Sequence, residues 1–285
     1  MNILIVGMGF GKAVYGEIYK QRNHRVVYVD LFDPNADYQS IKSIKGERFD
    51  VAHICTPNYS HHSLADDAAV ISNIVFVEKP GVANSEGWND LVNDHPNTRI
   101  VMVKNNQYRH NIDDMKQAAI KADRVNIHWR NRNRIPSPGS WFTTKHLAFG
   151  GVSRDLVPHL LSIYQMLNPN WKTSDITNSF AIQNWNLSNI QDSDYGTVNN
   201  NGIYNVDDSC RIQYDEKYNL WGDWRSMEPD DIAVHADDTV FELGLCPESA
   251  YESMIDTALA NADNDEFWHK QKEMDIWVHQ QLEAL

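Results

Sequence analysis

The chain has 285 residues, which is enough for two domains at the usual size of ~100–200 residues each. Hydrophobic residues make up 42% of it and charged residues 22%, so an ordinary globular core is expected. The formal net charge of -14 argues against nucleic acid and anionic membranes as general partners, because the overall field repels phosphate. Three widely spaced cysteines argue against a disulfide framework and favour the reducing cytoplasm. No apolar run approaches the ~20 residues of a membrane span.

Strand-like and helix-like segments alternate in the N-terminal part of the chain. Short apolar runs that end at glycine, acid or proline predict strands over residues 2–6, 25–30, 50–56, 74–77 and 99–103. Helical patterns separate them, over 12–21, after Asn58 and over 85–93. This alternation predicts a parallel sheet with right-handed crossovers, although the short connection from Asp30 to Asp50 predicts that one crossover helix is reduced.

The pattern changes after Lys104. Helices are predicted over 113–122 and 155–167, strands over 125–134, within 173–218 and over 232–245, and closing helices over 248–260 and 266–282. The polar, Asn-rich stretch from Thr173 to Tyr218 favours antiparallel strands with exposed faces. The predicted fold class is therefore α/β, with a dinucleotide-binding domain over residues 1–108 and a second domain over 109–285. The closing helices are also able to pack back onto the first domain.

Gly7, Gly9 and Gly11 lie between the first predicted strand and the first predicted helix. Glycines there permit a tight turn and a close approach of the backbone to a pyrophosphate, which the helix N-terminus favours. Asp30 closes the next strand 19 residues beyond Gly11, where a carboxylate bonds ribose hydroxyls and repels a 2′-phosphate. The pattern predicts NAD in preference to NADP, bound by this turn with Phe10 included, and the alternative is a bare glycine turn.

Two positions in this motif leave alternatives open. Lys12 stands where a third glycine is usual, and Gly11 is then expected to supply the close packing of helix on strand. Asp33 competes with Asp30 as the ribose-binding acid.

Residues 150–159 place a carboxylate and an imidazole just after a glycine pair. If a helix begins there, Asp155 and His159 share one face, one turn apart. Pro158 is tolerated only near a helix start, where its missing N–H costs nothing, so His159 is expected in the first turns.

Two further segments make a resemblance specific: residues 56–61 after the third strand and Glu78-Lys79-Pro80 after the fourth. Together with residues 150–159, and in this order, they resemble the Gfo/Idh/MocA family of NAD(P)-dependent sugar and polyol oxidoreductases, over roughly residues 1–167. The resemblance implies an N-terminal Rossmann domain and a C-terminal α/β domain. The open, mixed, largely antiparallel sheet of the second domain would carry the substrate and subunit contacts.

The resemblance also assigns cofactor contacts beyond the glycine turn. It places along the dinucleotide Thr56, Pro57, Asn58 and His61, and by the nicotinamide and its ribose Glu78 and Lys79. The segment Lys104–Tyr108 keeps a family pattern at Asn106, a cofactor contact, and at Tyr108, a substrate contact, while Gln107 replaces the usual arginine. His61 has an alternative role in capping or packing a helix.

Oxidation of a secondary alcohol removes the hydroxyl proton while hydride leaves the carbon. His159 is the predicted base, since the unperturbed pKa of histidine lies near neutrality. Asp155 is predicted to fix its tautomer or stabilise the imidazolium, and Lys79 to bond the reacting oxygen. All three are expected to contact the substrate. The alternatives are a helix cap for Asp155, a helix histidine with satisfied bonds for His159, and a solvated loop lysine.

Arg130, Arg132 and Arg134 recur at every second position of a predicted strand and would share one face with His128. This face is interpreted as a solvated or subunit-contact surface paired with acids such as Asp207, Asp208, Asp237 and Asp238. The alternative is an anion pocket around Arg132 for a sugar carboxylate or a nucleotide-sugar phosphate.

The predictions combine into an NAD-dependent oxidoreductase that transfers hydride between nicotinamide and a secondary alcohol or ketone of a sugar, polyol or sugar derivative. Trp141 is a candidate surface for the sugar ring, or else a core residue, and no spacing of ligands predicts a metal. A homo-dimer or homo-tetramer is expected. The alternatives are a non-catalytic dinucleotide-binding regulator of the same fold, a biliverdin-type reductase and an NAD-assisted glycosidase.

Overall fold

The computed structural model describes residues 1–285 and divides into two compact units. Met1–Val103 and Tyr251–Gln280 form the first unit, whereas Lys104–Ala250 and Gln281–Leu285 form the second. The first boundary falls after Val103, five residues before the predicted division at residues 108 and 109, and most of the closing helices belong with the first unit, which was the alternative for them.

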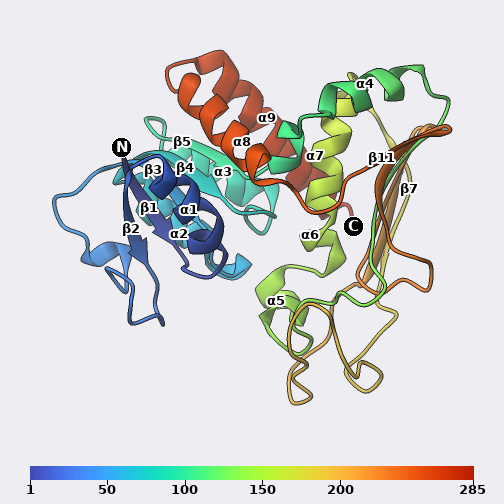
Figure 1. Ribbon diagram of the computed structural model, residues 1–285, viewed down its shortest axis with the longest axis horizontal. Helices are drawn as coiled ribbons and strands as arrows, with labels where there is room; N and C mark the ends of the chain where they lie inside the picture. The colour runs from blue at the N-terminus through green and yellow to red at the C-terminus, as the bar shows by residue number, and fades with distance from the viewer. The chain divides into compact units, whose positions relative to one another are not determined.

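The first unit is built on a five-stranded parallel sheet (Figure 1). Its strands are β1 (Asn2–Val6), β2 (Arg25–Val29), β3 (Phe49–Ile54), β4 (Ser72–Val77) and β5 (Arg99–Met102). Their order across the sheet is β2-β1-β3-β4-β5, so the strand order reverses between β1 and β3. Ligands of open parallel sheets bind at the carboxyl ends of the strands beside such a reversal. The predicted Rossmann sheet is therefore confirmed.

Helical segments connect these strands. They are a π-helical turn (Lys12–Gly16) continued by α1 (Glu17–Gln21), a 3-10 turn (Asn58–Ser60) leading into α2 (His61–Ala69), and α3 (Ser85–Asp94). The crossover from β2 to β3 contains only the short 3-10 turn Ile41–Ser43, as the short connection predicts.

The closing helices α8 (Glu248–Ala260) and α9 (Asp265–Glu283) lie beside α3 and β5 (Figure 1). Asp275 of α9 is fully buried and accepts a hydrogen bond from the backbone N–H of Met102 at 3.0 Å. The His279 ring stacks on Trp88 with 5.0 Å between ring centroids, and its Nε2 accepts from the Val82 N–H. A buried carboxylate and imidazole need such partners, and these bonds satisfy the polar groups that α9 buries within the first unit.

The second unit contains a six-stranded mixed sheet, and only β6 and β9 run parallel within it. Its strands are β6 (Val125–Arg130), β7 (Ile176–Ile182), β8 (Ser209–Tyr214), β9 (Tyr218–Asp223), β10 (Asp231–Ala236) and β11 (Thr239–Glu242). The order across the sheet is β11-β10-β6-β9-β8-β7. This agrees with the predicted open, largely antiparallel sheet.

The helices of the second unit are α4 (Ile112–Lys121), α5 (Lys145–Ala148), α6 (Val152–Asp155) and α7 (Val157–Leu167). Three 3-10 turns accompany them: Asn105–Tyr108, Trp141–Thr143 and Trp171–Thr173. The helix predicted over residues 155–167 is thus divided, with Leu156 between α6 and α7. Pro158 lies in the first turn of α7, where its missing N–H has no helical partner to lose.

Side chains of the second sheet alternate between a covered face and an open one. Ile127 and Trp129 of β6 are buried on the face that α7 covers, whereas Phe180, Ile182 and Val240 on the opposite face are exposed. Figure 1 draws no helix on that open face.

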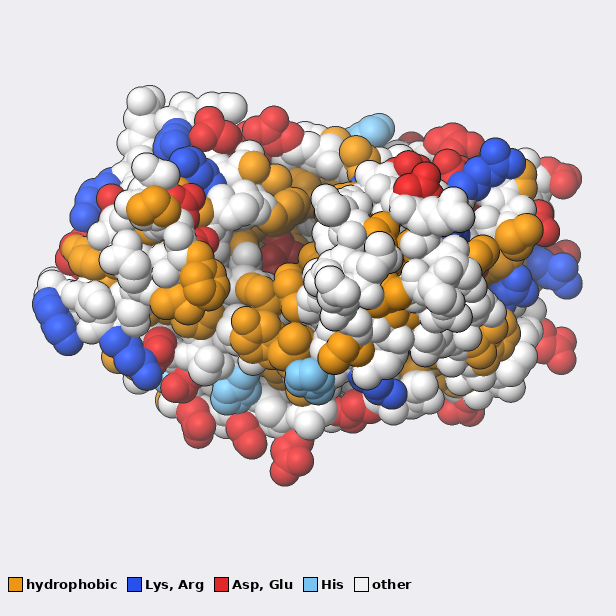
Figure 2. All heavy atoms as spheres, turned by 90° about the horizontal axis from the view of Figure 1, so that it is seen from below, with side chains coloured by type: hydrophobic (Ala, Val, Ile, Leu, Met, Phe, Trp, Pro, Cys, Tyr) orange, Lys and Arg blue, Asp and Glu red, His pale blue; other side chains and the backbone are white.

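No helix is long and apolar enough to cross a bilayer. On the face drawn in Figure 2, acidic and basic side chains are interspersed and no continuous basic surface is visible.

Candidate functional site

The turn between β1 and the following helix begins the candidate site of the first unit. Gly7 has a φ of +96°, and a Cβ there would lie 2.4 Å from the Cys55 carbonyl oxygen, so only glycine fits. A Cβ on Gly11 would lie 2.8 Å from Ile5 Cγ2, so Gly11 allows close packing of the helix on β1. A Cβ on Gly9 would meet nothing within 4 Å. The turn therefore leaves backbone open to a ligand at Gly9, which fits a pyrophosphate.

Asp30 is hydrogen-bonded to this turn. Its Oδ2 accepts from the Met8 N–H at 2.9 Å, and its Oδ1 accepts from the N–H groups of Phe32 at 2.9 Å and Asp33 at 3.1 Å. Partial burial raises the pKa of Asp30, but these hydrogen bonds outweigh it and hold that pKa below its ordinary value. Asp30 therefore stays ionised and suits ribose hydroxyls. The Asp33 carboxylate instead accepts from the Asn35 backbone and side chain.

Phe10, between Gly9 and Gly11, was also predicted to contact the cofactor. Its side chain is 46% exposed and packs edge-on against Tyr15, with ring centroids 5.9 Å apart.

The loop after β3 carries Thr56, Pro57 and Asn58, and His61 opens α2 behind it. His61 is fully buried, with Nδ1 2.7 Å from the Gly81 carbonyl oxygen and Nε2 2.8 Å from the Thr56 carbonyl oxygen. Burial lowers the pKa of His61. Both ring nitrogens lie within hydrogen-bond distance of a backbone carbonyl, and a neutral ring donates to one of the two, so His61 packs between the loops after β3 and β4. The geometry favours this packing role over the predicted direct contact with the cofactor.

Glu78 and Lys79 follow β4 directly, and the Lys79–Pro80 peptide bond is cis. The Tyr15 hydroxyl donates to Glu78 Oε1 at 2.7 Å. Burial raises the pKa of the Glu78 carboxyl, and burial also raises the pKa of Tyr15. Tyr15 was not predicted as a site residue, because in the sequence it only occupies the inner face of the first helix.

In the second unit, His159 has partners on two other elements. Its Nδ1 lies 3.0 Å from Asn106 Nδ2, and its ring stacks on Trp129 with 5.4 Å between centroids at 26°. Asn106 lies in the 3-10 turn after the first unit and is fully buried. Asp155, at the end of α6, accepts a hydrogen bond from Trp224 Nε1 at 2.8 Å. Trp129 and Trp224 were not predicted, and no local pattern in the sequence indicates them.

The glycine pair before α6 is required by a close approach of the chain. A Cβ on Gly151 would lie 1.7 Å from the Asp207 carbonyl oxygen. The Asp207 carboxylate accepts from the backbone N–H groups of Gly151 at 2.9 Å and Ser153 at 2.6 Å. Asp207 therefore caps the start of α6, which fixes the direction in which α6 and α7 leave the loop.

The remaining predicted substrate residues do not form one cluster with His159 through any described bond. Tyr108 ends the 3-10 turn that holds Asn106, and Trp141 stacks on Phe142 with 3.8 Å between centroids. The predicted common face of the arginines is wrong, because β6 ends at Arg130 and the Arg132 N–H bonds to Asp230 in a loop.

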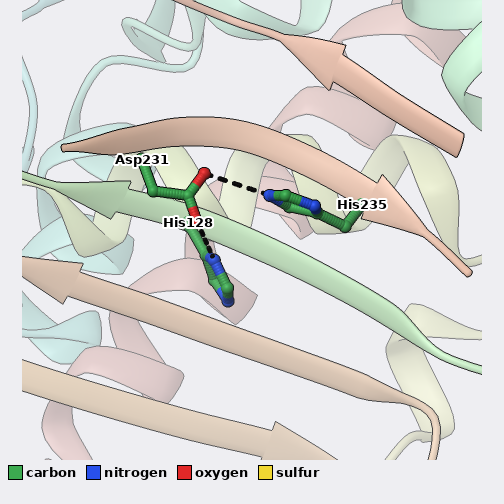
Figure 3. Close-up of side chains that lie close together, drawn as sticks. All are labelled: His128, Asp231 and His235. Atoms are coloured by element: carbon green, nitrogen blue, oxygen red, sulfur yellow. Dashed lines mark hydrogen bonds and ion pairs between the residues drawn. The ribbon is translucent and has the colours of Figure 1, made fainter. Parts of the chain in front are cut away.

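A His–Asp–His cluster lies on the open sheet face, on the adjacent strands β6 and β10 (Figure 3). Asp231 accepts from His128 Nδ1 at 2.8 Å through Oδ2 and from His235 Nε2 at 3.0 Å through Oδ1. Arg130 Nη2 lies 2.6 Å from the same Oδ2. Partial burial raises the pKa of Asp231, but these bonds outweigh it and hold that pKa well below its usual range.

These residue types and positions suit a metal ion, but Arg130 already supplies the balancing charge. We interpret the cluster as an ion-paired link between strands. The acid that pairs with this face is Asp231, and not Asp207, Asp208, Asp237 or Asp238.

Comparison with known proteins identifies the first unit. Residues 1–105 match the family model GFO_IDH_MocA, which is described as an oxidoreductase family with an NAD-binding Rossmann fold. The N-terminal domain belongs to the Gfo/Idh/MocA family. The predicted family and the predicted cofactor, NAD, are thereby confirmed.

Three similar proteins extend the comparison. An Amycolatopsis mediterranei protein, provisionally named a UDP-kanosamine synthase oxidoreductase subunit, is 24% identical over 134 residues, or 46% of this chain. That match spans 37% of the relative's length. The structure of GenD2 from gentamicin A biosynthesis, in complex with NAD, superposes with a TM-score of 0.73 at 17% identity, covering 100% of this chain and 92% of that one. Levoglucosan dehydrogenase, in complex with NADH and levoglucosan, gives 0.69 at 15% identity, covering 100% and 97%. These structures share the fold over both units.

Proposed function

We propose that the chain is an NAD-dependent oxidoreductase that moves hydride between nicotinamide and the CH–OH carbon of a sugar, polyol or sugar derivative. The observation that carries the proposal is the glycine turn joined to Asp30. The Gly7 N–H bonds to the Val29 carbonyl at 2.8 Å, and the Met8 N–H bonds to Asp30 at 2.9 Å. These two hydrogen bonds hold the backbone proposed to bind phosphate next to the carboxylate proposed to bind ribose.

The residues of the first unit are assigned roles in holding the dinucleotide. Backbone N–H groups near Gly9 bind the pyrophosphate, since the first turn of a helix has N–H groups without helical acceptors. Asp30 accepts the ribose hydroxyls, and its negative charge disfavours the 2′-phosphate of NADP. Thr56, Asn58 and Glu78 follow β3 and β4 at the carboxyl edge of the sheet, where the rest of the cofactor is expected.

We assign the reacting oxygen to Lys79 and His159, and we assign a supporting role in the reaction to Asp155. On oxidation the O–H proton passes to a protein base, the C–H electron pair leaves as hydride, and a ketone remains. Bound NAD+ supplies the hydride acceptor, and NADH supplies hydride in the reverse direction. The protein's part is to orient the carbinol, to hold its proton and to stabilise the charge on its oxygen.

A carbohydrate substrate is supported by the names of the relatives. Levoglucosan dehydrogenase binds levoglucosan in its structure, and the Amycolatopsis mediterranei protein is named after a sugar nucleotide. Within this chain, Tyr108 and Trp141 are the aromatic residues that we assign to the sugar, and Arg132 is assigned to an anionic substituent.

A homo-oligomer is proposed through the open face of the second sheet. Phe180 is 37% and Ile182 44% exposed on the edge strand β7, and Val240 is 49% exposed on the opposite edge strand β11. A sheet face that no helix covers and that exposes apolar side chains at both edges favours association with another surface. Free thiols at Cys55, Cys210 and Cys246 support a reducing compartment, and we propose the cytoplasm.

The test is a panel of sugars, polyols, sugar acids and nucleotide sugars, with NADH absorbance followed in the presence of NAD or NADP. We expect turnover of at least one carbohydrate with NAD in preference to NADP. Lys79→Met should reduce kcat by about 10²–10⁴ and leave the Kd for NAD nearly unchanged. Tight binding of NAD with no turnover of any compound would favour the non-catalytic regulator instead.

A further inference from the structure

The His159 imidazole faces an amide nitrogen. Asn106 Nδ2 lies 3.0 Å from His159 Nδ1. An amide nitrogen donates and does not accept, so Nδ1 must be the acceptor and carries no proton in this contact. Neutral His159 therefore holds its single proton on Nε2.

The direction of the Asn106 amide follows from Arg109. The Arg109 Nε–H donates to Asn106 Oδ1 at 2.8 Å, so the amide oxygen faces the guanidinium and the amide nitrogen faces the imidazole. A reversed amide would set two donors against each other at Arg109. Arg109 is itself held, because its guanidinium donates to the backbone carbonyls of Leu243 and Gly244. Asn106 is 0% and Arg109 5% exposed, so water is not available to replace these bonds.

Two neighbouring features affect whether His159 gains a second proton. His159 is the third residue of α7, whose positive N-terminal end disfavours an imidazolium. A proton added to Nδ1 would also point at the Asn106 amide hydrogens. The negative charge of Asp155 favours a protonated His159. However, Asp155 Oδ2 accepts a hydrogen bond from Trp224 Nε1 at 2.8 Å, which stabilises part of that charge.

We infer that Asn106, oriented by Arg109, is a positioning residue that keeps His159 as the neutral Nε2–H tautomer, so that His159 donates a hydrogen bond to the substrate oxygen and is not the proton acceptor. The inference rests on the proposed dehydrogenase function. It reverses the role predicted for His159 as the base, and it gives to Asn106 the tautomer-fixing role predicted for Asp155.

The proton then has a different destination. In this assignment the substrate O–H proton passes on oxidation to Lys79 in its unprotonated form, which becomes an ammonium, and bound NAD+ would accept the hydride. His159 keeps its proton, and its N–H stabilises the negative charge that develops on the oxygen. On reduction the Lys79 ammonium returns the proton to the forming alkoxide.

Nitrogen NMR of histidine-labelled protein, without substrate, reads the tautomer directly. The chain has 12 histidines, so His159→Gln identifies the His159 signals by their loss. We expect a protonated Nε2 and an unprotonated Nδ1 in the wild type at neutral pH. Asn106→Asp places an acceptor of the same shape against Nδ1, so we expect the proton to move to Nδ1 and His159 to titrate at higher pH. The control Asn111→Asp adds the same charge at the N-cap of α4 and should change neither property.

Kinetics then test the role. If Nε2–H is the working donor, Asn106→Asp should lower kcat by about 100-fold, with the KM for NAD changed little. A protonated Nδ1 in the wild type would overturn the inference, and so would full activity in an Asn106→Asp protein whose tautomer has reversed. Absence of turnover by the wild type on every carbohydrate would refute the proposed function, and the NMR result would still decide the tautomer.

Discussion

The two units make their candidate sites from different parts of the chain. In the first unit the site consists largely of backbone: an open turn at Gly9, a turn that tolerates no Cβ at Gly7, and loops with the His61 ring packed between them. In the second unit it consists of side chains, with His159 held by Asn106 and Trp129. A backbone site is lost when atoms are added, and a side-chain site is lost when atoms are removed.

This difference separates binding from chemistry. Substitutions at the glycine turn should act on cofactor affinity or on the stability of the first unit. Substitutions around His159 should act on turnover while the cofactor still binds. Variants that mix the two effects would show that the separation is wrong.

Among substitutions in the second unit, the largest effect is expected for His159→Ala. Loss of the N–H donor to the reacting oxygen should lower kcat by about 10²–10³, equivalent to about 3–4 kcal/mol, with the Kd for NAD unchanged within a factor of about two. His146→Ala, an exposed histidine of α5 in the same unit, is the matched control and should keep full activity. Steady-state kinetics and NAD titration measure both quantities. A weakened NAD affinity with normal kcat would assign His159 to cofactor binding.

Gly7→Ala should come next. Its Cβ would lie 2.4 Å from the Cys55 carbonyl oxygen at a φ of +96°, so the backbone of the turn must shift. We expect the first unit to lose about 2–3 kcal/mol of unfolding free energy, and NAD binding with it. Thermal unfolding without cofactor measures the loss. A variant as stable as the wild type would mean that the turn is more adaptable than its geometry indicates.

Gly9→Ala sharpens the contrast between two glycines of one motif. No protein atom lies within 4 Å of the added Cβ, so stability should change by less than about 0.5 kcal/mol. The methyl group occupies space next to the backbone that we assign to pyrophosphate, so the Kd for NAD should rise about tenfold or more, or about 1.4 kcal/mol. Unchanged affinity would place the phosphates elsewhere. Together, Gly7 and Gly9 distinguish a glycine needed by the protein from one needed by the ligand.

Much of the first unit could be predicted from sequence, because its signals are local. Each strand is a continuous apolar run, and the glycine turn and Asp30 are set by spacing along two neighbouring strands. The sequence left open which unit the closing helices join, since their attachment depends on Asp275 reaching the backbone of Met102, 173 residues away. Local sequence also could not decide whether His61 packs between loops or contacts the cofactor, because its packing depends on two carbonyl groups that come together only in the folded loops.

The second unit was less predictable for the same physical reason. Asn106 and His159 are 53 residues apart, and Asp155 and Trp224 are 69 apart, so no periodicity relates them. The sequence places an arginine at every second position beyond Arg130, where β6 ends. The backbone after β6, however, bonds to the end of β9 and to the loop that follows β9. The Arg134 N–H donates to the Trp224 carbonyl at 2.7 Å, which ends the strand pattern on which the arginine face depended.

The smallest effect is expected for Trp224→Phe. This change removes only the indole N–H that donates to Asp155 Oδ2 at 2.8 Å and keeps an aromatic ring in a buried site. The Asp155 carboxylate loses a donor and becomes a stronger competitor for protons near His159, so kcat should fall by less than about tenfold, or 1.4 kcal/mol, with its pH profile displaced. Trp221→Phe, on the open face of β9, is the control and should leave the profile unchanged. A loss as large as that of His159→Ala would mean that Asp155 takes a direct part in the chemistry. No change in either kcat or the profile would mean that Asp155 only ends α6, and that the second unit needs only Asn106 to set the proton on its histidine.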